Sequence, residues 1–173
     1  MVLSVGTADN KNLEALIEAL KGISCRLMII GRLSIKQKEL LSLNGIAYEN
    51  RFDLSREEIY RCYLQADLLC FVSTYEGFGM PIIEAQAVGC PVITSNLEPM
   101  PEIAGDAALF VDPFNIAEIR NAVITLLSDG KLRKALTHKG YRNIQRFKPD
   151  IIAQDYYILY KDVFSGQIKS SSS

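Results

Sequence analysis

Two glutamates, Glu76 and Glu84, stand with seven residues between them in the run EGFGMPIIE. Gly77 and Gly79 allow the backbone to turn sharply and to approach a ligand closely. Pro81 is expected at the first position of a following helix, where its missing N–H costs nothing. The free N–H groups and the positive dipole end at such a start favour a phosphate or another anion. The segment therefore combines an anion cradle with two hydrogen-bonding carboxylates, which suits a sugar nucleotide.

The same residues also have a purely structural interpretation. A glutamate in a first helical turn is favourable for the helix dipole alone, and a glycine-rich segment before a proline is ordinary turn chemistry. The continuation EAQAVGCPVITS, residues 84–95, favours the functional interpretation. It predicts a short helix of small residues, a glycine stop, and a strand that ends in polar groups.

Apolar strands alternate with helical periodicity along the whole chain. The periodicity places Leu13, Leu16, Ile17 and Leu20 on one face of an amphipathic helix, and Ser55 begins a capping box. Strands are predicted at 2–6, 26–30, 46–48, 68–72, 91–94 and 107–111. Helices are predicted at 12–20, 36–43, 55 to about 64, 116–127, 131–145 and 151–163.

This alternation predicts an α/β fold with a doubly wound, mostly parallel, Rossmann-like sheet of about six strands and helices on both faces. Ligands of such sheets bind at the C-terminal ends of the strands. The loops 6–11, 31–34, 50–53, 73–79 and 95–100 are expected at that edge. The domain is expected to span residues 1–165, and the low-complexity residues 166–173 are expected to form a disordered tail.

Length and composition agree with one packed domain. The chain has 173 residues, of which 49% are hydrophobic, and its net charge of -1 argues against nucleic-acid binding. No apolar run approaches the roughly 18 residues that span a bilayer. Nothing at the start of the chain resembles a signal peptide, so a cytoplasmic location is expected.

No metal site is expected. The four cysteines, Cys25, Cys62, Cys70 and Cys90, are not spaced like a zinc or redox pair and are interpreted as buried small hydrophobes. His138 is the only histidine, which excludes a metal cluster built on imidazoles, and it is expected at the surface. No Asp-x-Asp motif occurs.

The run STYEGFGMPIIEA, residues 73–85, resembles the Glu-seven-Glu motif of retaining glycosyltransferases and is most similar to glycosyltransferase family 4. The run MPEIAGDAA, residues 100–108, resembles that family's next landmark. The likeness extends from Val2 to about Phe164 and corresponds to the C-terminal, donor-binding half of the two-domain GT-B architecture. It implies glycosyl transfer from a nucleoside-diphosphate sugar with retained anomeric configuration, without a metal ion or a cofactor.

The resemblance also implies roles for the residues of the motif. It implies that Glu84 binds the hydroxyls of the donor ribose. It also implies that Glu76, the catalytic candidate, hydrogen-bonds the sugar near its 3-hydroxyl. The backbone that would contact the sugar and the phosphates belongs to Gly77, Phe78, Gly79 and Met80.

The loop after the first strand supplies the remaining candidates for phosphate binding. Lys11 matches the family's phosphate-binding lysine, and Thr7 is a donor-binding candidate in the same loop. The family usually has an arginine a few residues before this lysine, whereas here the loop is one residue shorter and has none. Arg32, after the second strand, is a candidate substitute; the alternative is a solvated surface arginine.

The expected partners are a nucleotide-sugar donor and an N-terminal GT-B domain or partner subunit, which would carry the acceptor site and usually a histidine. Without that partner the chain is expected to bind the donor weakly and to transfer little or nothing. Any peripheral membrane association would arise through the partner. The last predicted helix carries apolar residues that are candidates to contact this partner or a second copy of the chain, and ordinary core packing is the alternative. These residues are Ile151, Tyr156, Tyr157, Leu159 and Tyr160.

Three other functions compete with this interpretation. One half of a GT-B sugar-nucleotide epimerase would share the fold, but the intact glutamate pair with its flanking glycines favours a transferase. A non-catalytic subunit of a split glycosyltransferase is the second. A dinucleotide-dependent oxidoreductase is the weakest, because no Gly-x-Gly-x-x-Gly follows the first strand.

Overall fold

The structure, a computed structural model, describes residues 1–164, except for the side chains at 155, 159 and 162–164. It divides into two compact units, Met1–Asn143 and Ile144–Ser173. The expected single domain over residues 1–165 stays a prediction. The predicted tail at 166–173 lies outside the described residues.

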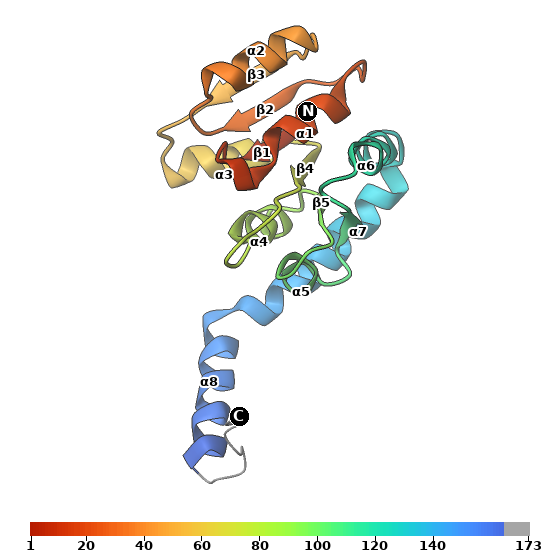
Figure 1. Ribbon diagram of the computed structural model, residues 1–173. Coiled ribbons are helices and arrows are strands. Elements are labelled where there is room, and N and C mark those ends of the chain that lie inside the picture. The colour runs from red at the N-terminus through yellow and green to blue at the C-terminus, as the bar shows by residue number, and fades with distance from the viewer. Residues whose placement is uncertain (165–173) are drawn as a thin grey trace. The chain divides into compact units, whose positions relative to one another are not determined.

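Within residues 1–143 the chain forms a six-stranded sheet with the order β3-β2-β1-β4-β5-β6 (Figure 1). Every neighbouring pair is parallel. The side chains of the four inner strands are almost all buried, as expected when helices cover both faces. The predicted doubly wound, Rossmann-like fold is therefore confirmed. The strands are β1 (Val2–Val5), β2 (Leu27–Ile30), β3 (Tyr48–Arg51), β4 (Leu68–Phe71), β5 (Val92–Ser95) and β6 (Ala108–Val111).

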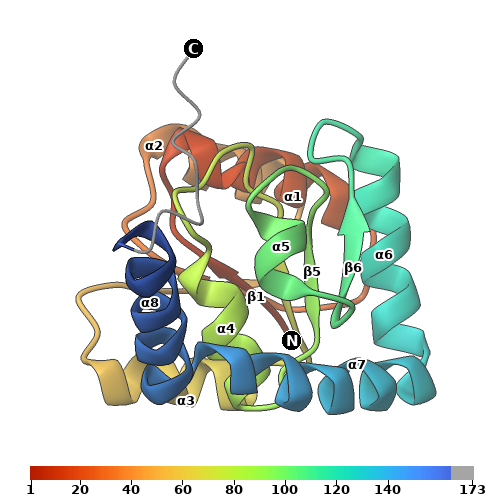
Figure 2. The same cartoon turned by 90° about the horizontal axis from the view of Figure 1, so that it is seen from below.

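Helices cover both faces of this sheet (Figures 1 and 2). One face carries α1 (Leu13–Leu20), α2 (Ile35–Leu43) and α6 (Ile116–Ser128), and the other carries α3 (Arg56–Gln65), α4 (Met80–Ala87) and α5 (Met100–Ala104). The helix α7 (Gly130–Asn143) packs against α4 and α6. The strand order reverses between β1 and β4, so the loops after these two strands meet at a topological switch point.

Local sequence signals explain most of these elements. The predicted apolar face of α1 is buried in the core. Ser55 caps α3 as predicted: its hydroxyl accepts from the Glu58 N–H, and the Glu58 carboxylate accepts from the Ser55 N–H at 2.8 Å. An equivalent capping box, formed by Ser34 and Gln37, begins α2 and was not predicted.

Several element boundaries differ from the sequence prediction, and two short elements were missed. The third strand covers Tyr48–Arg51 rather than 46–48, because an edge strand tolerates polar residues that an apolar pattern misses. The helix α4 begins at Met80, after Gly79, so Pro81 is second in the helix and not first. The five-residue helix α5 and a 3-10 turn at Asp9–Lys11 were too short to show periodicity.

The second unit begins with a 3-10 turn, Ile144–Phe147, so the helix predicted at 131–145 ends two residues early, at Asn143. The helix α8 (Pro149–Phe164) follows and exposes Ile151, Tyr156, Tyr157 and Tyr160, while the Leu159 side chain lies outside the described ones. The rings of Tyr156 and Tyr160 stack with centroids 6.4 Å apart. Among the described residues, none of the helices has the length and apolar character needed to cross a bilayer.

Candidate functional site

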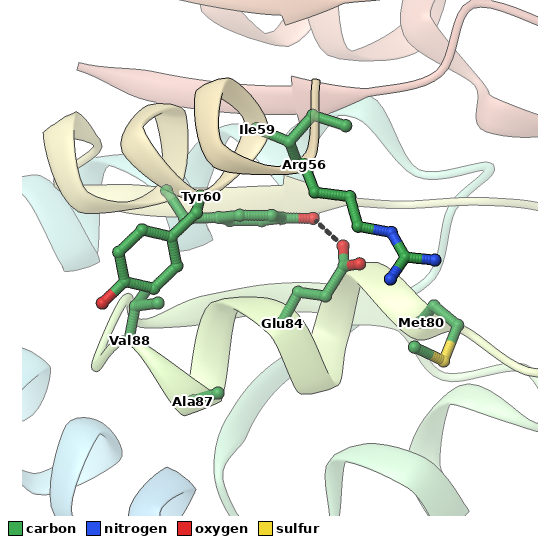
Figure 3. A pocket seen from close by; sticks show the side chains of 8 residues that line it. Arg56, Ile59, Tyr60, Met80, Glu84, Ala87 and Val88 are labelled. Atoms are coloured by element: carbon green, nitrogen blue, oxygen red, sulfur yellow. Dashed lines mark hydrogen bonds between the residues drawn. The ribbon is translucent and has the colours of Figure 1, made fainter. Parts of the chain in front are cut away.

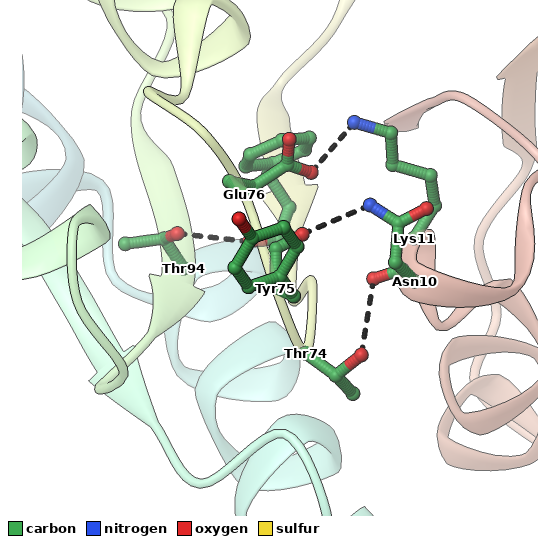
Figure 4. Close-up of polar contacts among 7 residues, drawn as sticks. Asn10, Lys11, Thr74, Tyr75, Glu76 and Thr94 are labelled. Atoms are coloured by element: carbon green, nitrogen blue, oxygen red, sulfur yellow. Dashed lines mark hydrogen bonds and ion pairs between the residues drawn. The ribbon is translucent and has the colours of Figure 1, made fainter.

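The loops after β1 and β4 are held together at the switch point by Asn10. Its carbonyl oxygen accepts from the Thr74 N–H at 2.9 Å and from the Thr74 hydroxyl at 3.5 Å, and its side-chain amide donates to the Tyr75 carbonyl at 2.9 Å; Figure 4 draws the contacts of the Thr74 hydroxyl and of the Asn10 amide. Asn12 adds a second link, because its amide donates to the carbonyl oxygens of Val72 and Pro113 at 3.1 and 2.7 Å. These contacts fix the positions of the residues that follow each strand.

Lys11 and Glu76 face one another from these two loops (Figure 4). The Lys11 ammonium lies 2.6 Å from Oε1 of Glu76, and the two side chains are only 22% and 11% exposed. The ammonium also lies 5.0 Å from the centre of the Phe71 ring, within the range of a cation–π interaction. The structure thus brings together two predicted site residues that are 65 positions apart.

Gly6 provides the space that this arrangement needs. Its φ angle is +92°, and a Cβ built there would lie 2.8 and 2.9 Å from two carbons of the Lys11 side chain. The lysine stem therefore passes directly over the glycine. A larger residue would combine backbone strain with a clash against Lys11.

The turn before α4 is exposed at Gly77 and Phe78 and buried at Gly79. Gly79 is the N-cap of α4, with a φ angle of +107° and no side-chain hydrogen bond to the first turn. Phe78 and Met80 are partly exposed on either side of it, and a Cβ at Gly77 would meet no atom within 4 Å. An uncapped helix start with open space before it favours an anion.

Glu84 lies one turn into α4 and borders a pocket of about 480 Å³ between α3 and α4 (Figure 3). The hydroxyl of the buried Tyr63 donates to Oε2 of Glu84 at 2.7 Å. Burial raises the pKa of Tyr63 far above its ordinary value, and the nearby Glu84 raises it further, so the tyrosine remains a proton donor. The lining residues are Arg56, Ile59, Tyr60, Tyr63, Met80, Glu84, Ala87 and Val88.

Thr7 and Arg32 lie on the β2 side of the same sheet edge. The Thr7 hydroxyl donates to the Arg32 carbonyl at 2.8 Å. The exposed Arg32 guanidinium pairs with Asp53 and lies 4.7 Å from the centre of the Phe52 ring. The Arg32 guanidinium therefore contacts the loop after β3, whereas the Lys11 ammonium contacts the loop after β4 and Phe71 at the end of that strand.

Several site residues have no signal in the sequence motif. Asn10 is adjacent to Lys11, yet only the fold shows that it ties two loops together. Tyr63 and Tyr60 belong to an ordinary amphipathic helix, whose packing beside α4 makes them neighbours of Glu84. The signal that could have found them is their helical spacing of three residues, which places both on nearby parts of α3.

The remaining candidates behave as structural or surface residues. Cys62, Cys70 and Cys90 are buried, Cys25 is half-buried, and all are free thiols. His138 is exposed. The described part of the chain holds no group of three His, Cys, Asp or Glu side chains placed to bind a metal ion.

Comparison with known proteins places this geometry in a family. Residues 1–143 match the family described as "Glycosyl transferases group 1". The chain is 36% identical over 91 residues to O-antigen chain mannosyltransferase B of Escherichia coli, covering 53% of this chain and 24% of that protein. It is 30% identical over 165 residues to N-acetylgalactosamine-N,N'-diacetylbacillosaminyl-diphospho-undecaprenol 4-alpha-N-acetylgalactosaminyltransferase of Campylobacter jejuni, covering 89% and 44%. The chain thus spans less than half the length of these relatives.

Solved structures share the fold. The C-terminal domain of a glycosyl transferase group 1 family protein (LpcC) from Francisella tularensis is 28% identical, with a TM-score of 0.73 and coverage of 86% of this chain and 85% of that one. Sucrose-phosphate synthase from Thermosynechococcus elongatus is 23% identical, with a TM-score of 0.80 over 95% of this chain and 46% of that one. These matches favour a transferase over the epimerase alternative. The chain belongs to the glycosyl transferases group 1 family, with a Rossmann-like domain of the GT-B type.

Proposed function

We propose that this chain binds a nucleoside-diphosphate sugar and provides the donor side of a retaining glycosyltransferase, as in glycosyltransferase family 4. One observation carries the proposal: the Lys11–Glu76 pair and the uncapped start of α4 lie at the same edge of the sheet, and Glu84 lines a pocket from that same helix. A cation, the backbone N–H groups of a turn at a helix start and two carboxylates match the charges and hydroxyls of a sugar nucleotide.

The diphosphate is assigned to Lys11 and to the backbone turn of Gly77, Phe78, Gly79 and Met80. Hydrogen bonds to charged groups contribute about 1.5–3 kcal/mol each, so a lysine and a few N–H groups give useful affinity. Thr7 lies in the same loop as Lys11 but donates its hydroxyl to a backbone carbonyl. Arg32 is proposed to contribute only if it leaves Asp53.

The nucleoside is assigned to the pocket between α3 and α4. The Tyr63 hydroxyl already occupies one oxygen of Glu84, which leaves the other oxygen to accept hydrogen bonds from the ribose. Ile59, Tyr60 and Val88 supply apolar surface for the base. A pocket of about 480 Å³ is within the usual range for a small-molecule site.

In the proposed reaction, the bond between the anomeric carbon and the diphosphate oxygen breaks, and its electron pair stays on the diphosphate. The acceptor hydroxyl attacks the anomeric carbon from the same face, and its proton passes to the departing diphosphate. Lys11 and the dipole of α4 stabilise the leaving charge, which is a large contribution when the groups are fixed in advance. Because they supply positive charge, we propose that no metal ion or other cofactor is needed.

The acceptor is assigned to a second GT-B domain, in the same polypeptide or in a partner subunit, because the chain spans less than half of the relatives it matches. Such a pair of domains would close over the sheet edge that carries Lys11 and Glu76. The exposed apolar side chains of α8 are a candidate contact for that domain or for a second copy of the chain. A cytoplasmic location is part of the proposal.

The test is calorimetric titration of the 173-residue chain with UDP, GDP and ADP, followed by NMR with the nucleotide that binds. We expect the amide signals of residues 77–80 to shift, and we expect Lys11→Met to weaken binding at least tenfold. Lys21→Met, which removes a lysine at the end of α1, is the matched control. Shifts confined to the opposite edge of the sheet, or equal effects of the two lysine changes, would refute the assignment.

A further inference from the structure

The site contains an internal competitor for a bound diphosphate. Glu76 accepts a hydrogen bond from the Lys11 ammonium at 2.6 Å, and its side chain is 11% exposed. Removing one partner from a poorly solvated ion pair leaves an uncompensated charge, which is strongly unfavourable. Lys11 therefore cannot turn to a phosphate without a cost at Glu76.

The backbone around the pair prevents it from simply moving apart. Asn10 joins the two loops on either side of the pair, which holds Lys11 and Glu76 close together. Arg32 does not relieve Glu76, because its guanidinium pairs with Asp53 beside the loop after β3. A diphosphate that attracts Lys11 would also bring its own negative charge near Glu76.

A sugar attached to the diphosphate changes this balance. A sugar hydroxyl can donate a hydrogen bond to Glu76. This bond replaces the one that the Lys11 ammonium donates to Glu76 before it turns to the phosphate. Charge-assisted hydrogen bonds of this kind are roughly twice as strong as neutral ones. The free nucleoside diphosphate has no such hydroxyl at that position.

We propose that Glu76 makes this site select the nucleoside-diphosphate sugar over the free nucleoside diphosphate, by competing for Lys11 until a sugar hydroxyl takes the place of the ammonium. The inference rests on the proposed function. Its consequence is that the nucleoside diphosphate left after transfer binds more weakly than the substrate, which assists its release.

The test compares the affinities of UDP and UDP-glucose, and of GDP and GDP-mannose, for the full chain and its Glu76→Gln variant by calorimetry. We expect the variant to bind the free diphosphate more tightly, on the order of tenfold, because Lys11 is no longer held by a carboxylate. Binding of the glycosylated ligand should improve less or become weaker. The preference for the glycosylated ligand should therefore fall.

Two control variants separate this effect from a general loss of charge. Glu84→Gln removes the same charge from the same segment. It should lower the affinities for both ligands and leave the preference for the glycosylated ligand unchanged. Asp9→Asn removes an exposed charge two residues from Lys11 and should change either affinity less than about twofold, since solvent and salt screen it.

The outcomes distinguish this inference from the proposed function. If the unmodified chain binds nucleotides and Lys11→Met abolishes binding, but Glu76→Gln leaves the free diphosphate unchanged or weaker, the inference is wrong and the proposed function stands. An equal gain for both ligands would also overturn the inference. If neither the unmodified chain nor Glu76→Gln binds any of the four ligands, the proposed function fails and the inference fails with it.

Discussion

Replacing Glu84 by glutamine tests the ribose assignment most directly. In the structure one carboxylate oxygen accepts from the Tyr63 hydroxyl at 2.7 Å, and the carboxylate borders the pocket between α3 and α4. Glutamine has nearly the same shape and keeps one oxygen. That oxygen can still accept from Tyr63, so the amide NH₂ would then be left to face the ribose.

The magnitude follows from the exchange of charged for neutral hydrogen bonds. A bond to a charged group contributes about 1.5–3 kcal/mol, whereas a neutral one contributes about 0.5–1.5 kcal/mol. Two ribose hydroxyls would therefore lose about 2 kcal/mol together, which corresponds to roughly thirtyfold weaker binding. Folding should change little, because Tyr63 keeps an acceptor.

The assay is calorimetry of Glu84→Gln with a nucleoside diphosphate and with its glycosylated form, beside a thermal melt. The affinities for both ligands should fall by the same factor, since both ligands carry the ribose. Glu57→Gln, which changes an exposed carboxylate on α3 that pairs with Arg61, is the matched control and should have almost no effect. If Glu84→Gln left both ligands unaffected but lowered the melting temperature, Glu84 would serve only to hold Tyr63, and the ribose assignment would be refuted.

Three further changes test how the fold supports the site. Gly6→Ala should weaken nucleoside-diphosphate binding and lower stability, because the new methyl group meets the Lys11 stem and the φ angle is +92°; calorimetry and melting would measure both. Gly89→Ala should lower the free energy of unfolding by about as much as Gly6→Ala, about 1–3 kcal/mol, because its φ angle is +78° and the new methyl group overlaps an α7 side chain. The molecules that stay folded should bind nucleotide with unchanged affinity. Ser55→Ala should raise the pKa of Glu58, which hydrogen bonds from the Ser55 hydroxyl and N–H hold below its ordinary value. Because the pKa of Glu58 is lower in the folded than in the unfolded state, ionised Glu58 stabilises the fold at pH values above its unfolded-state pKa of about 4.3. This stabilisation is lost as the pH falls through the folded-state pKa. The Ser55→Ala variant lacks part of it and should therefore lose less stability on acidification. Carboxyl NMR titrations and melts from pH 6 to pH 3 would measure this, and an unchanged Glu58 titration would contradict it.

The sheet was predictable because its inner strands are continuous apolar runs separated by turn residues. Those runs at 2–6, 26–30, 68–72 and 91–94 place four strands within a residue or two of their observed positions. The edge strand β3 was misplaced because Glu49, Asn50 and Arg51 are polar, and their role in pairing depends on β2. Asn50 even donates its side-chain amide to the Ile29 and Gly31 carbonyls, a contact that no local pattern contains.

The shared sheet edge of the candidate site residues was predictable, but the contacts between them were not. The motif and the strand order together indicate that Lys11 and Glu76 share one edge, but only the packing of their loops shows that they pair directly. The resemblance assigns Glu76 to the sugar, whereas its pair with Lys11 also connects it to the residue that is assigned to the diphosphate. The contact of Tyr63 with Glu84 depends on how α3 packs beside α4, which is a long-range property of the fold.

The helices differ in how their first turns are capped. Ser34, Ser55 and Asn115 cap α2, α3 and α6 with side-chain oxygens. The helix α4 begins instead at Gly79, whose φ angle is +107° and which has no side chain to cap it; α1 and α5 also begin without a side-chain cap. A serine or aspartate N-cap stabilises a helix by only roughly a few tenths of a kcal/mol relative to glycine, and the φ angle at residue 79 itself favours glycine. The glycine leaves no side chain over the start of α4, close to the half-buried Glu76, and this is where the proposed function assigns the diphosphate.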